Sequence, residues 1–396
     1  MQPPAPPTKS CNSPPTSPSK HSSSRSPRQA EHADRRRKRR RRSPKKCPAG
    51  QPPASRCHGP RLRACLGVPV HTPWVRVSRE DVLVAGRRID GRVRRTPLLR
   101  PSGLDAVWFK CEFLQHCGVF KTRGAFNRQL AALETGELGD AGVVVASGGN
   151  AGLAHAFVGR ELGVRVTVFV PQAAPAVKVE RIQAYGAEVR RVGAEYAEAF
   201  EAAVRFADEG GAAFAHAYDQ LEVAAGAGTL GEEILADEPS IDTIIVAVGG
   251  GGLYAGVAAA ASGRARVVAV EPERCPTLSG AMAARVPVDV PVSGVASDSL
   301  GARRVGALAF AAQEVEPPVS VLVSDEDIVR ARSALWREYR MPSEFGAAAA
   351  YAALLSGRYV PGDGERVAVV GVRRQHGPEH AGDAQLVPTG SLASMA

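Results

Sequence analysis

The sequence contains few cysteines and no long apolar run, and each shortage excludes a class of protein. Only 7 of the 396 residues are Cys, and none of them forms a Cys-x-x-Cys pair. We therefore expect neither a disulfide framework nor a zinc site, and a reducing cytoplasm is the predicted location. No uncharged apolar stretch reaches the ~18–20 residues of a membrane-spanning helix, so no membrane insertion is predicted. The length leaves room for about two domains.

Acidic residues are scarce in one segment only. The net charge is +10, but residues 1–66 hold 17 Lys and Arg against two acidic residues. The remaining chain holds 33 basic and 38 acidic residues and is therefore mildly acidic. The basic excess thus gives no reason to predict nucleic-acid binding by the folded body.

Residues 1–66 form a basic segment rich in proline, serine and arginine. They hold 13 of the 30 prolines and the run of eight basic residues at 35–42. Such a composition buries too little apolar surface to offset the entropy of ordering, so we predict disorder. Three explanations stay open: a nuclear or polyanion-binding patch, an organelle transit segment, or a start codon assigned too early. An apolar signal segment is missing, so secretion is not expected.

After this segment, short Val-rich runs alternate with Ala-rich stretches of helical period. Strands are predicted at 142–146, 164–170, 243–248, 267–270 and 366–370, and helices at 151–162, 174–185 and 195–208. Continuous apolar strands separated by helices indicate an α/β fold with parallel sheets covered on both faces. In such folds sites lie at the carboxyl ends of strands.

Two of the strand-to-helix junctions carry polar side chains. Lys121 stands between Phe120 and a predicted helix, although a solvated lysine would account for it equally well. Ser147, Gly149 and Asn150 follow the first strand directly. A helix that begins there exposes backbone amides able to bind a carboxylate or phosphate. The alternative is a simple Ser or Asn cap on a glycine turn.

The third junction is a run of four glycines, 249–252, between a strand and the helix predicted at 254–261. Consecutive glycines allow positive φ and let several amides converge on one anion, which favours a phosphate site over a loose linker. The same residues fit a dinucleotide fingerprint, with Ala255 as its last small residue and Glu271 as the ribose ligand. That alternative leaves the other two junctions unexplained.

Together, and in this order, the three junctions resemble the fold-type-II pyridoxal-phosphate enzymes, most of all the threonine and serine dehydratases. The resemblance covers about residues 77–370 and rests on the segments 119–125, 147–150 and 249–252. It implies twisted, parallel-rich sheets covered by helices, in two domains. Residues 67–141 and 217–370 would form the large cofactor domain, and 142–216 the small mobile domain.

The resemblance also implies a role for each motif residue. Lys121 would form a Schiff base with the aldehyde of pyridoxal 5'-phosphate and then take the substrate Cα proton. Further cofactor contacts would come from Phe120, Asn150, Gly249, Gly250, Gly251, Gly252, Leu253 and Glu344. The substrate carboxylate would be bound by Ser147, Gly148, Gly149, Asn150 and Ala151. Glu344 as a solvated surface acid, and His155 as a purely structural histidine, are the competing interpretations.

The implied activity is the dehydrative deamination of L-threonine or L-serine to a 2-oxo acid and ammonia. Serine racemase has a second Ser where this sequence has Gly148, so racemisation should be weak or absent. No metal is expected, because residues 271–277 lack the later carboxylate that binds a divalent ion in that relative. A homodimer acting on a small amino acid is implied. A catalytically impaired paralogue, an NAD-type oxidoreductase and polyanion binding through residues 1–66 are the alternatives.

One departure from the family lies at the carboxyl end. The last strand normally leads into a Ser- or Cys-Gly-Gly-Asn turn that meets the pyridine nitrogen, and residues 371–380 contain no such turn. Codons can be chosen for these residues that encode Cys-Gly-Gly-Asn in a shifted frame. We therefore hypothesise that a single-base frameshift altered residues 371–396.

Overall fold

The computed structural model of the protein describes residues 75–104 and 106–371. The basic segment 1–66 and residues 372–396 lie outside the described residues, so the expectations about them stay predictions. The chain divides at Gly67, and the fold below belongs to the part that begins at Val68.

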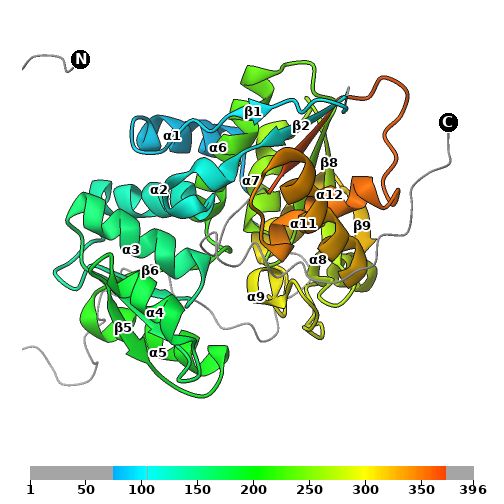
Figure 1. Ribbon diagram of the computed structural model, residues 1–396. Coiled ribbons are helices and arrows are strands. Elements are labelled where there is room, and N and C mark those ends of the chain that lie inside the picture. The colour runs from blue at the N-terminus through cyan, green and yellow to red at the C-terminus, as the bar shows by residue number, and fades with distance from the viewer. Residues whose placement is uncertain (1–74, 105, 372–396) are drawn as a thin grey trace, which may run out of the picture. The chain divides into compact units, whose positions relative to one another are not determined.

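The larger of two sheets has six strands in the order β1-β2-β10-β7-β8-β9 (Figure 1). Their bounds are β1 Leu98–Leu99, β2 Val107–Lys110, β7 Thr243–Ala247, β8 Arg266–Pro272, β9 Val319–Val323 and β10 Val367–Val370. All neighbours pair in parallel except β1 and β2. The central strands β7 and β10 are fully buried, as their uninterrupted apolar sequences predict.

The smaller sheet has four parallel strands in the order β5-β4-β3-β6. Their bounds are β3 Val143–Ala146, β4 Val166–Val170, β5 Glu188–Arg191 and β6 Ala213–Ala215. The central strands β3 and β4 are buried along their whole length. The edge strand β5 is polar and partly exposed, as expected for a strand with one free side.

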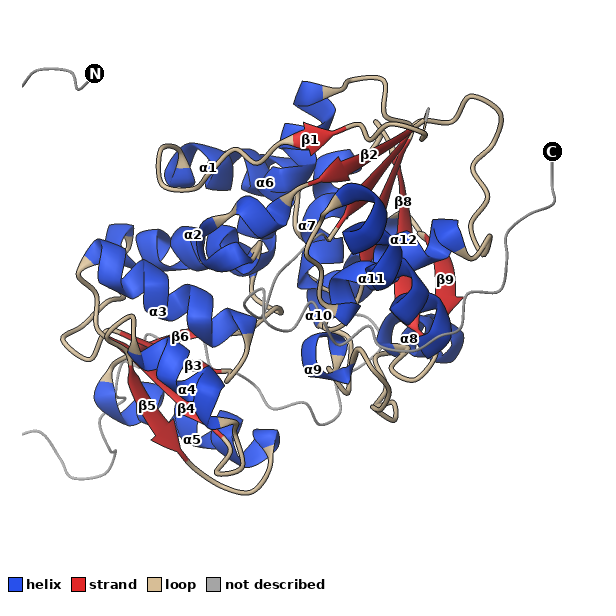
Figure 2. Cartoon of the chain, viewed as in Figure 1, coloured by secondary structure: helices blue, strands red, loops and turns tan. Residues whose placement is uncertain are grey.

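Helices cover both faces of each sheet (Figure 2). In the first half of the chain the bounds are α1 Arg79–Ile89, α2 Lys121–Glu134, α3 Asn150–Leu162, α4 Ala176–Gln183, α5 Tyr196–Gly210 and α6 Leu221–Asp237. In the second half they are α7 Gly252–Ala261, α8 Thr277–Ala284, α9 Ser297–Leu300, α10 Ala307–Val315, α11 Asp325–Tyr339 and α12 Phe345–Leu355. Two 3-10 turns, Glu112–Leu114 and His116–Gly118, precede α2. On the larger sheet, α7 and α12 pack on opposite faces, and α2 packs against both α3 and α6.

The α/β class with parallel sheets covered by helices is confirmed. The predicted helix at 174–185 is shorter in the structure, because Pro175 stands at its N-cap and α4 begins one residue later. The predicted helix at 254–261 begins earlier, at Gly252. The domain boundaries given by the sequence stay a prediction.

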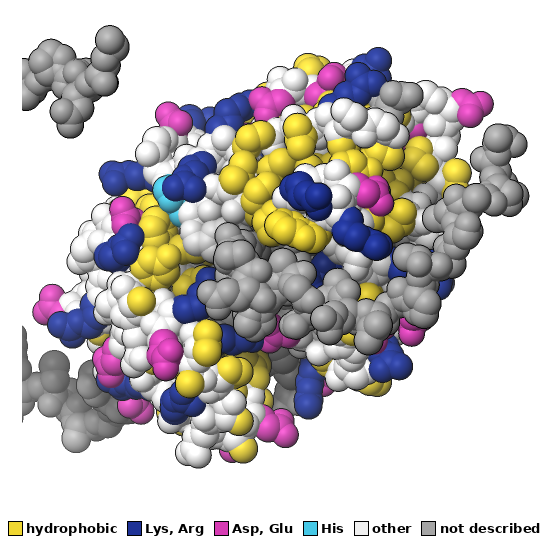
Figure 3. All heavy atoms as spheres, in the orientation of Figure 1, with side chains coloured by type: hydrophobic (Ala, Val, Ile, Leu, Met, Phe, Trp, Pro, Cys, Tyr) yellow, Lys and Arg dark blue, Asp and Glu magenta, His cyan; other side chains and the backbone are white. Residues whose placement is uncertain are grey.

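Basic and acidic side chains are interspersed over the face visible in Figure 3, with apolar side chains between them. This mixture agrees with the nearly balanced charge of the chain after residue 66. No helix among the described residues is long and apolar enough to cross a membrane.

Helices α2 and α6 approach each other closely through glycine. A Cβ atom at Gly226 would lie 2.7 Å from the Arg123 carbonyl oxygen and 2.7 Å from the Gly124 Cα. Both neighbours are backbone atoms, which cannot swing aside.

We predict that Gly226→Ala lowers the free energy of unfolding by about 1–3 kcal/mol, measured by urea denaturation. Gly210→Ala is the control, because a Cβ there meets no atom within 4 Å; a gain of up to ~1 kcal/mol is expected. Equal effects of the two substitutions would contradict the close packing.

Candidate active site

Lys121 is the first residue of α2, and its side chain reaches a backbone carbonyl far along the chain. Its Nζ donates to the Ala217 carbonyl oxygen over 3.0 Å. The same nitrogen lies 5.2 Å from the centroid of the Phe120 ring, and Phe120 is buried. The amine is therefore held at the carboxyl end of β6, which is where a parallel sheet presents its functional groups.

The segment that accepts Lys121 is shaped by His216. The His216 Nδ1 accepts hydrogen bonds from the amides of Tyr218 and Asp219, over 3.2 and 2.8 Å. This nitrogen must be unprotonated to accept them. Burial lowers the pKa of His216 to about 4; the Asp219 charge opposes the shift and the Lys121 charge adds to it. The neutral ring thus stabilises the turn against Lys121 at ordinary pH.

Tyr218 packs against the run of four glycines at 249–252, called here the glycine loop. A Cβ at Gly250 would lie 2.4 Å from the Tyr218 ring, and one at Gly252 would lie 2.3 Å from the Tyr218 carbonyl oxygen. Ala217 and Tyr218 therefore contact Lys121 on one side and the glycine loop on the other. The amine and the loop, separated by more than a hundred residues, meet at this segment.

The first three carbonyl groups of the glycine loop are engaged. The Gly249 carbonyl accepts from the Thr277 hydroxyl at 2.5 Å, and the Gly250 carbonyl accepts from the Gly306 amide at 3.0 Å. The Gly251 carbonyl accepts from the Ala255 amide at 2.8 Å within α7. These bonds fix the loop from the carbonyl side.

The amide groups of the glycine loop, unlike its carbonyl groups, lack recorded hydrogen-bond partners among the described residues. Among residues 75–104 and 106–371, no acceptor is recorded for the amides from Gly250 to Leu253. Gly251 has φ 89°, a left-handed conformation that favours glycine and reverses the chain into α7. Consecutive amides without acceptors at a helix start suit a phosphate group.

The turn after β3 has the predicted form, and α3 begins at Asn150. The Gly149 amide donates to the Ser147 hydroxyl at 3.3 Å. Asn150 is buried, and its Nδ2 lies 3.5 Å from a carboxylate oxygen of Glu344 at the start of α12. This contact favours a site role for Glu344 over that of a solvated surface acid.

His155 lies on α3, away from solvent. Its Nδ1 lies 3.3 Å from the Gln129 side-chain amide. Burial, with the charges of Arg128 and Lys121, lowers its pKa to about 3, so the ring is neutral. The packing matches the interpretation of His155 as a structural residue.

Glu271 does not fit the role of a ribose ligand. It is 0% exposed, and its two oxygens accept from the amides of Leu278 and Ser279, each at 2.7 Å. A carboxylate held inside the protein in this way cannot reach a bound dinucleotide. The structure thus argues against the nicotinamide interpretation of the glycine loop.

Four residues around the site are not predicted by any sequence pattern: Ala217, Tyr218, Thr277 and Gly306. Ala217 and Tyr218 follow β6, which has only three residues and gives almost no strand signal. Thr277 and Gly306 each make a single hydrogen bond to the glycine loop, and no local sequence pattern predicts such a contact.

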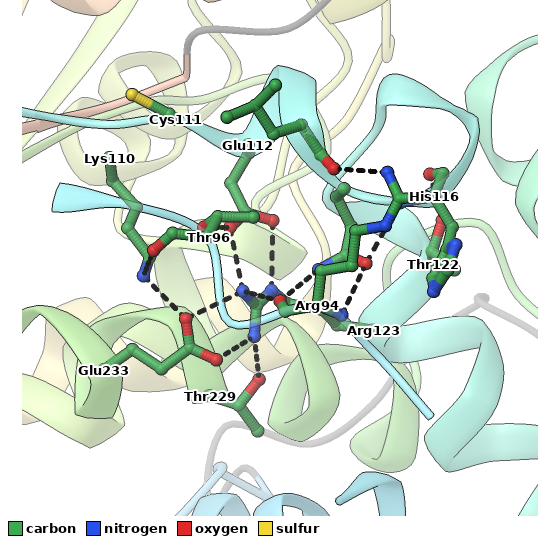
Figure 4. Close-up of polar contacts among 12 residues, drawn as sticks. Arg94, Thr96, Lys110, Cys111, Glu112, His116, Thr122, Arg123, Thr229 and Glu233 are labelled. Carbon is green, nitrogen blue, oxygen red and sulfur yellow. Dashed lines mark hydrogen bonds and ion pairs between the residues drawn. The ribbon is translucent and has the colours of Figure 1, made fainter. Parts of the chain in front are cut away.

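A buried group of charged side chains surrounds Arg123, near the start of α2 (Figure 4). Arg123, two residues after Lys121, contacts Glu112 at 2.9 Å and Glu233 at 2.6 Å. Lys110 contacts Glu233 at 2.6 Å and donates to the Thr96 carbonyl. We call Lys110, Glu112, Arg123 and Glu233 the ion cluster; its two cations and two anions balance.

The ion cluster shifts the pKa values of its members. Burial alone would raise the pKa of Glu233, but hydrogen bonds and charges from Arg123 and Lys110 outweigh burial and lower it. The carboxylates of Glu112 and Glu233 likewise raise the pKa of Arg123 against the effect of burial. Because the pKa of Glu233 is lowered by folding, its contribution to stability is present above its usual value and is lost as pH falls through the lowered one.

Residues 89–371 match the family described as pyridoxal-phosphate dependent enzyme. This chain belongs to that family. It is 36% identical over 294 residues to an L-threonine ammonia-lyase of Geobacter sulfurreducens, covering 72% of this chain and 73% of that protein.

Solved structures of this pyridoxal-phosphate-dependent family are similar as well. A threonine deaminase from T.th. has a TM-score of 0.68 and 31% identity, covering 75% of this chain and 98% of that one. Maize serine racemase has a TM-score of 0.71 and 29% identity, covering 76% and 94%. The cofactor of this enzyme is pyridoxal 5'-phosphate.

The residues present fit this cofactor. Pyridoxal 5'-phosphate needs an amine for its aldehyde and hydrogen-bond donors for its phosphate. Lys121 supplies an amine, and the glycine loop supplies amides for which no acceptor is recorded among the described residues. The loop is packed so closely that a Cβ at any of its four glycines would lie within 3.0 Å of a neighbouring protein atom. Both groups contact the segment of Ala217 and Tyr218.

We predict that neutralising a carboxylate of the ion cluster destabilises the protein far more than neutralising an exposed carboxylate. Glu112→Gln would leave the buried ion cluster with two cations and only Glu233 to balance them, so we expect a loss of about 3–5 kcal/mol in the free energy of unfolding. Glu134→Gln is the control, since Glu134, which pairs with Arg88, is exposed, and a change below ~1 kcal/mol in the free energy of unfolding is expected. Urea denaturation measures both. If the two variants lost equal amounts of unfolding free energy, burial of the ion cluster would not contribute to stability as proposed.

Proposed function

We propose that this enzyme is an ammonia-lyase that converts L-threonine or L-serine to a 2-oxo acid and ammonia. The observation that carries the proposal is Gly148, within the predicted carboxylate-binding turn. The family relatives include both ammonia-lyases and a racemase. A glycine at this position offers no side chain that could return a proton to the substrate.

The cofactor would be held at both ends by residues of this chain. Lys121 would bind its aldehyde, and the amides from Gly250 to Leu253 would bind its phosphate. Asn150, with Glu344 beside it, would contact the ring, and Phe120 would pack near it. When bound, pyridoxal phosphate supplies an electron sink for negative charge that develops on the substrate carbon.

Lys121 would also move the proton of the reaction. Once the substrate amine has displaced it, the neutral Nζ can accept the proton from the substrate Cα. The Ala217 carbonyl, which accepts from Nζ at 3.0 Å, orients the amine. The positively polarised start of α2 lies at the same residue and favours electron-rich groups near it.

The turn from Ser147 to Ala151 would bind the substrate carboxylate at the start of α3. Fixing the carboxylate presents the Cα–H bond to one face, where Lys121 is placed by this proposal. The β-hydroxyl leaves with a proton as water, and a second water releases the nitrogen as ammonia. Water is lost and regained, so the net products are the 2-oxo acid and ammonia.

The first test concerns the amine. We predict that borohydride reduction attaches the cofactor to the peptide containing Lys121, detected by mass spectrometry, and that Lys121→Ala abolishes both attachment and 2-oxo acid release. Lys178→Ala is the control for attachment, because Lys178 pairs with Asp298 and lies outside the predicted site. Attachment that persists in Lys121→Ala would contradict the proposal.

The second test concerns the reaction type. With L-serine the native enzyme should release ammonia and 2-oxo acid, with D-serine formation at least about 100-fold slower, a difference of ~2.7 kcal/mol in barrier. We predict that Gly148→Ser raises the ratio of D-serine to 2-oxo acid. Gly148→Ala is the control, because a Cβ there meets the Val170 side chain at 3.3 Å and reproduces the crowding without the hydroxyl. Rapid D-serine formation by the native enzyme would favour a racemase instead.

A further inference from the structure

A buried carboxyl group lies behind the glycine loop and has no part in the proposed reaction. Glu271 stands near the carboxyl end of β8 and is 0% exposed. One oxygen accepts from the Leu278 amide and the other from the Ser279 amide, both in the first turn of α8. These two bonds hold the carboxyl group in a fixed orientation.

Thr277 connects this carboxyl group with the glycine loop. Its Oγ1 lies 2.5 Å from the Gly249 carbonyl oxygen and 3.1 Å from Glu271 Oε1. A hydroxyl group carries one hydrogen, so it can donate fully to only one of these two oxygens. If it donates to Gly249, a hydrogen between Thr277 and Glu271 must come from the carboxyl group.

We propose that Glu271 and Thr277 are positioning residues for the glycine loop, and that the proton on Glu271 decides whether the Thr277 hydroxyl donates to the Gly249 carbonyl. With the proton present, Glu271 donates to Thr277 and Thr277 donates to Gly249. With the proton absent, the carboxylate competes for the Thr277 hydrogen. The proposal rests on the assignment of the glycine loop to the cofactor phosphate and is independent of which amino acid the enzyme uses.

The environment of Glu271 makes this proton available in the ordinary pH range. Burial raises the pKa of Glu271 to about 7, although the hydrogen bonds from Leu278, Ser279 and Thr277 oppose the shift. The titratable neighbour Cys275 has its pKa raised to about 11 by burial and by the charges of Glu271 and Asp325, so it stays neutral.

The charged side chains around Glu271 are paired with one another. Arg274 on the same loop contacts Asp325 at the start of α11 over 3.6 Å. Glu273 contacts Arg358, which also contacts Asp327 of α11, each over 3.1 Å. Asp327 also contacts Arg330, so the three acids and the three arginines of these pairs balance one another.

The loop responds to this proton through one hydrogen bond. Below the pKa of Glu271 the Gly249 carbonyl has its donor, and the loop is fixed with its amides available for phosphate. Above that pKa the donor turns toward the carboxylate, and the loop loses one of its three carbonyl contacts. A hydrogen bond of this kind changes an affinity by about three- to tenfold.

The test compares Thr277→Val with Thr277→Ser, because serine keeps the hydroxyl and valine removes it. The dissociation constant of pyridoxal 5'-phosphate is measured on the full-length holoenzyme by dilution, at about pH 6 and about pH 8.5. EDTA is present, so that no divalent cation replaces the proton. At the lower pH we expect the valine variant to hold the cofactor about three- to tenfold more weakly than the serine variant. At the higher pH the dissociation constants of the two variants should agree within about twofold.

The comparison cancels the titrations of the phosphate and of Lys121, which both variants share. Phosphorus NMR of the bound cofactor gives a second readout: the two variants should differ in chemical shift at the lower pH and converge at the higher. Equal cofactor affinities of the two variants at the lower pH, or a difference in affinity that is unchanged at the higher pH, would overturn the proposal.

Pyridoxal without its phosphate tests the assignment of the glycine loop to the cofactor phosphate. Native enzyme that holds pyridoxal as tightly as pyridoxal 5'-phosphate would overturn the loop assignment and the proposal with it.

Discussion

The pairing of Arg123 with Glu112 and Glu233 fixes the start of helix α2. Arg123 is fully buried and stands two residues after Lys121, in the same turn of the helix. Glu112 lies in the 3-10 turn after β2, and Glu233 lies on α6, so the three side chains join segments far apart in the sequence. Breaking such a buried pair is strongly unfavourable, because the remaining charge has no water around it. The position of Lys121 is therefore set by an interaction outside the site.

Lys121 and the glycine loop meet because both contact the segment of Ala217 and Tyr218. The neutral ring of His216 shapes that segment, and Gly250 and Gly252 leave room for Tyr218. On the far side, Thr277 and Gly306 engage the loop carbonyls. The loop is thus fixed on one side, while its amides on the other have no acceptor among the described residues. A site built this way is preorganised for an anion, and the phosphate of the family's cofactor is the anion it fits.

Much of this arrangement could be predicted from the sequence, because the decisive residues are local. The apolar runs of β3, β7 and β8 predicted a parallel sheet, and Asn150 and the glycine loop each stand where a strand gives way to a helix. Lys121 begins a helix as well, but two 3-10 turns separate it from β2. Ala217 and Tyr218 could not be predicted, since β6 is too short to give a strand signal. The partnership of Glu271 with Thr277 was also missed. It depends on which atoms face each other across β8 and α8, which a linear pattern does not contain. The ion cluster joins β2, α2 and α6 and is likewise a property of the packed chain.

The central claim is that Lys121 and the glycine loop bind the two ends of one pyridoxal 5'-phosphate molecule. A crystal structure of the full-length protein with this cofactor tests it most directly. The account predicts electron density that is continuous from Lys121 Nζ into the cofactor, with phosphate oxygens in hydrogen-bond range of the amides from Gly250 to Leu253. A phosphate bound away from the glycine loop, or an unmodified Lys121 beside a bound cofactor, would contradict it.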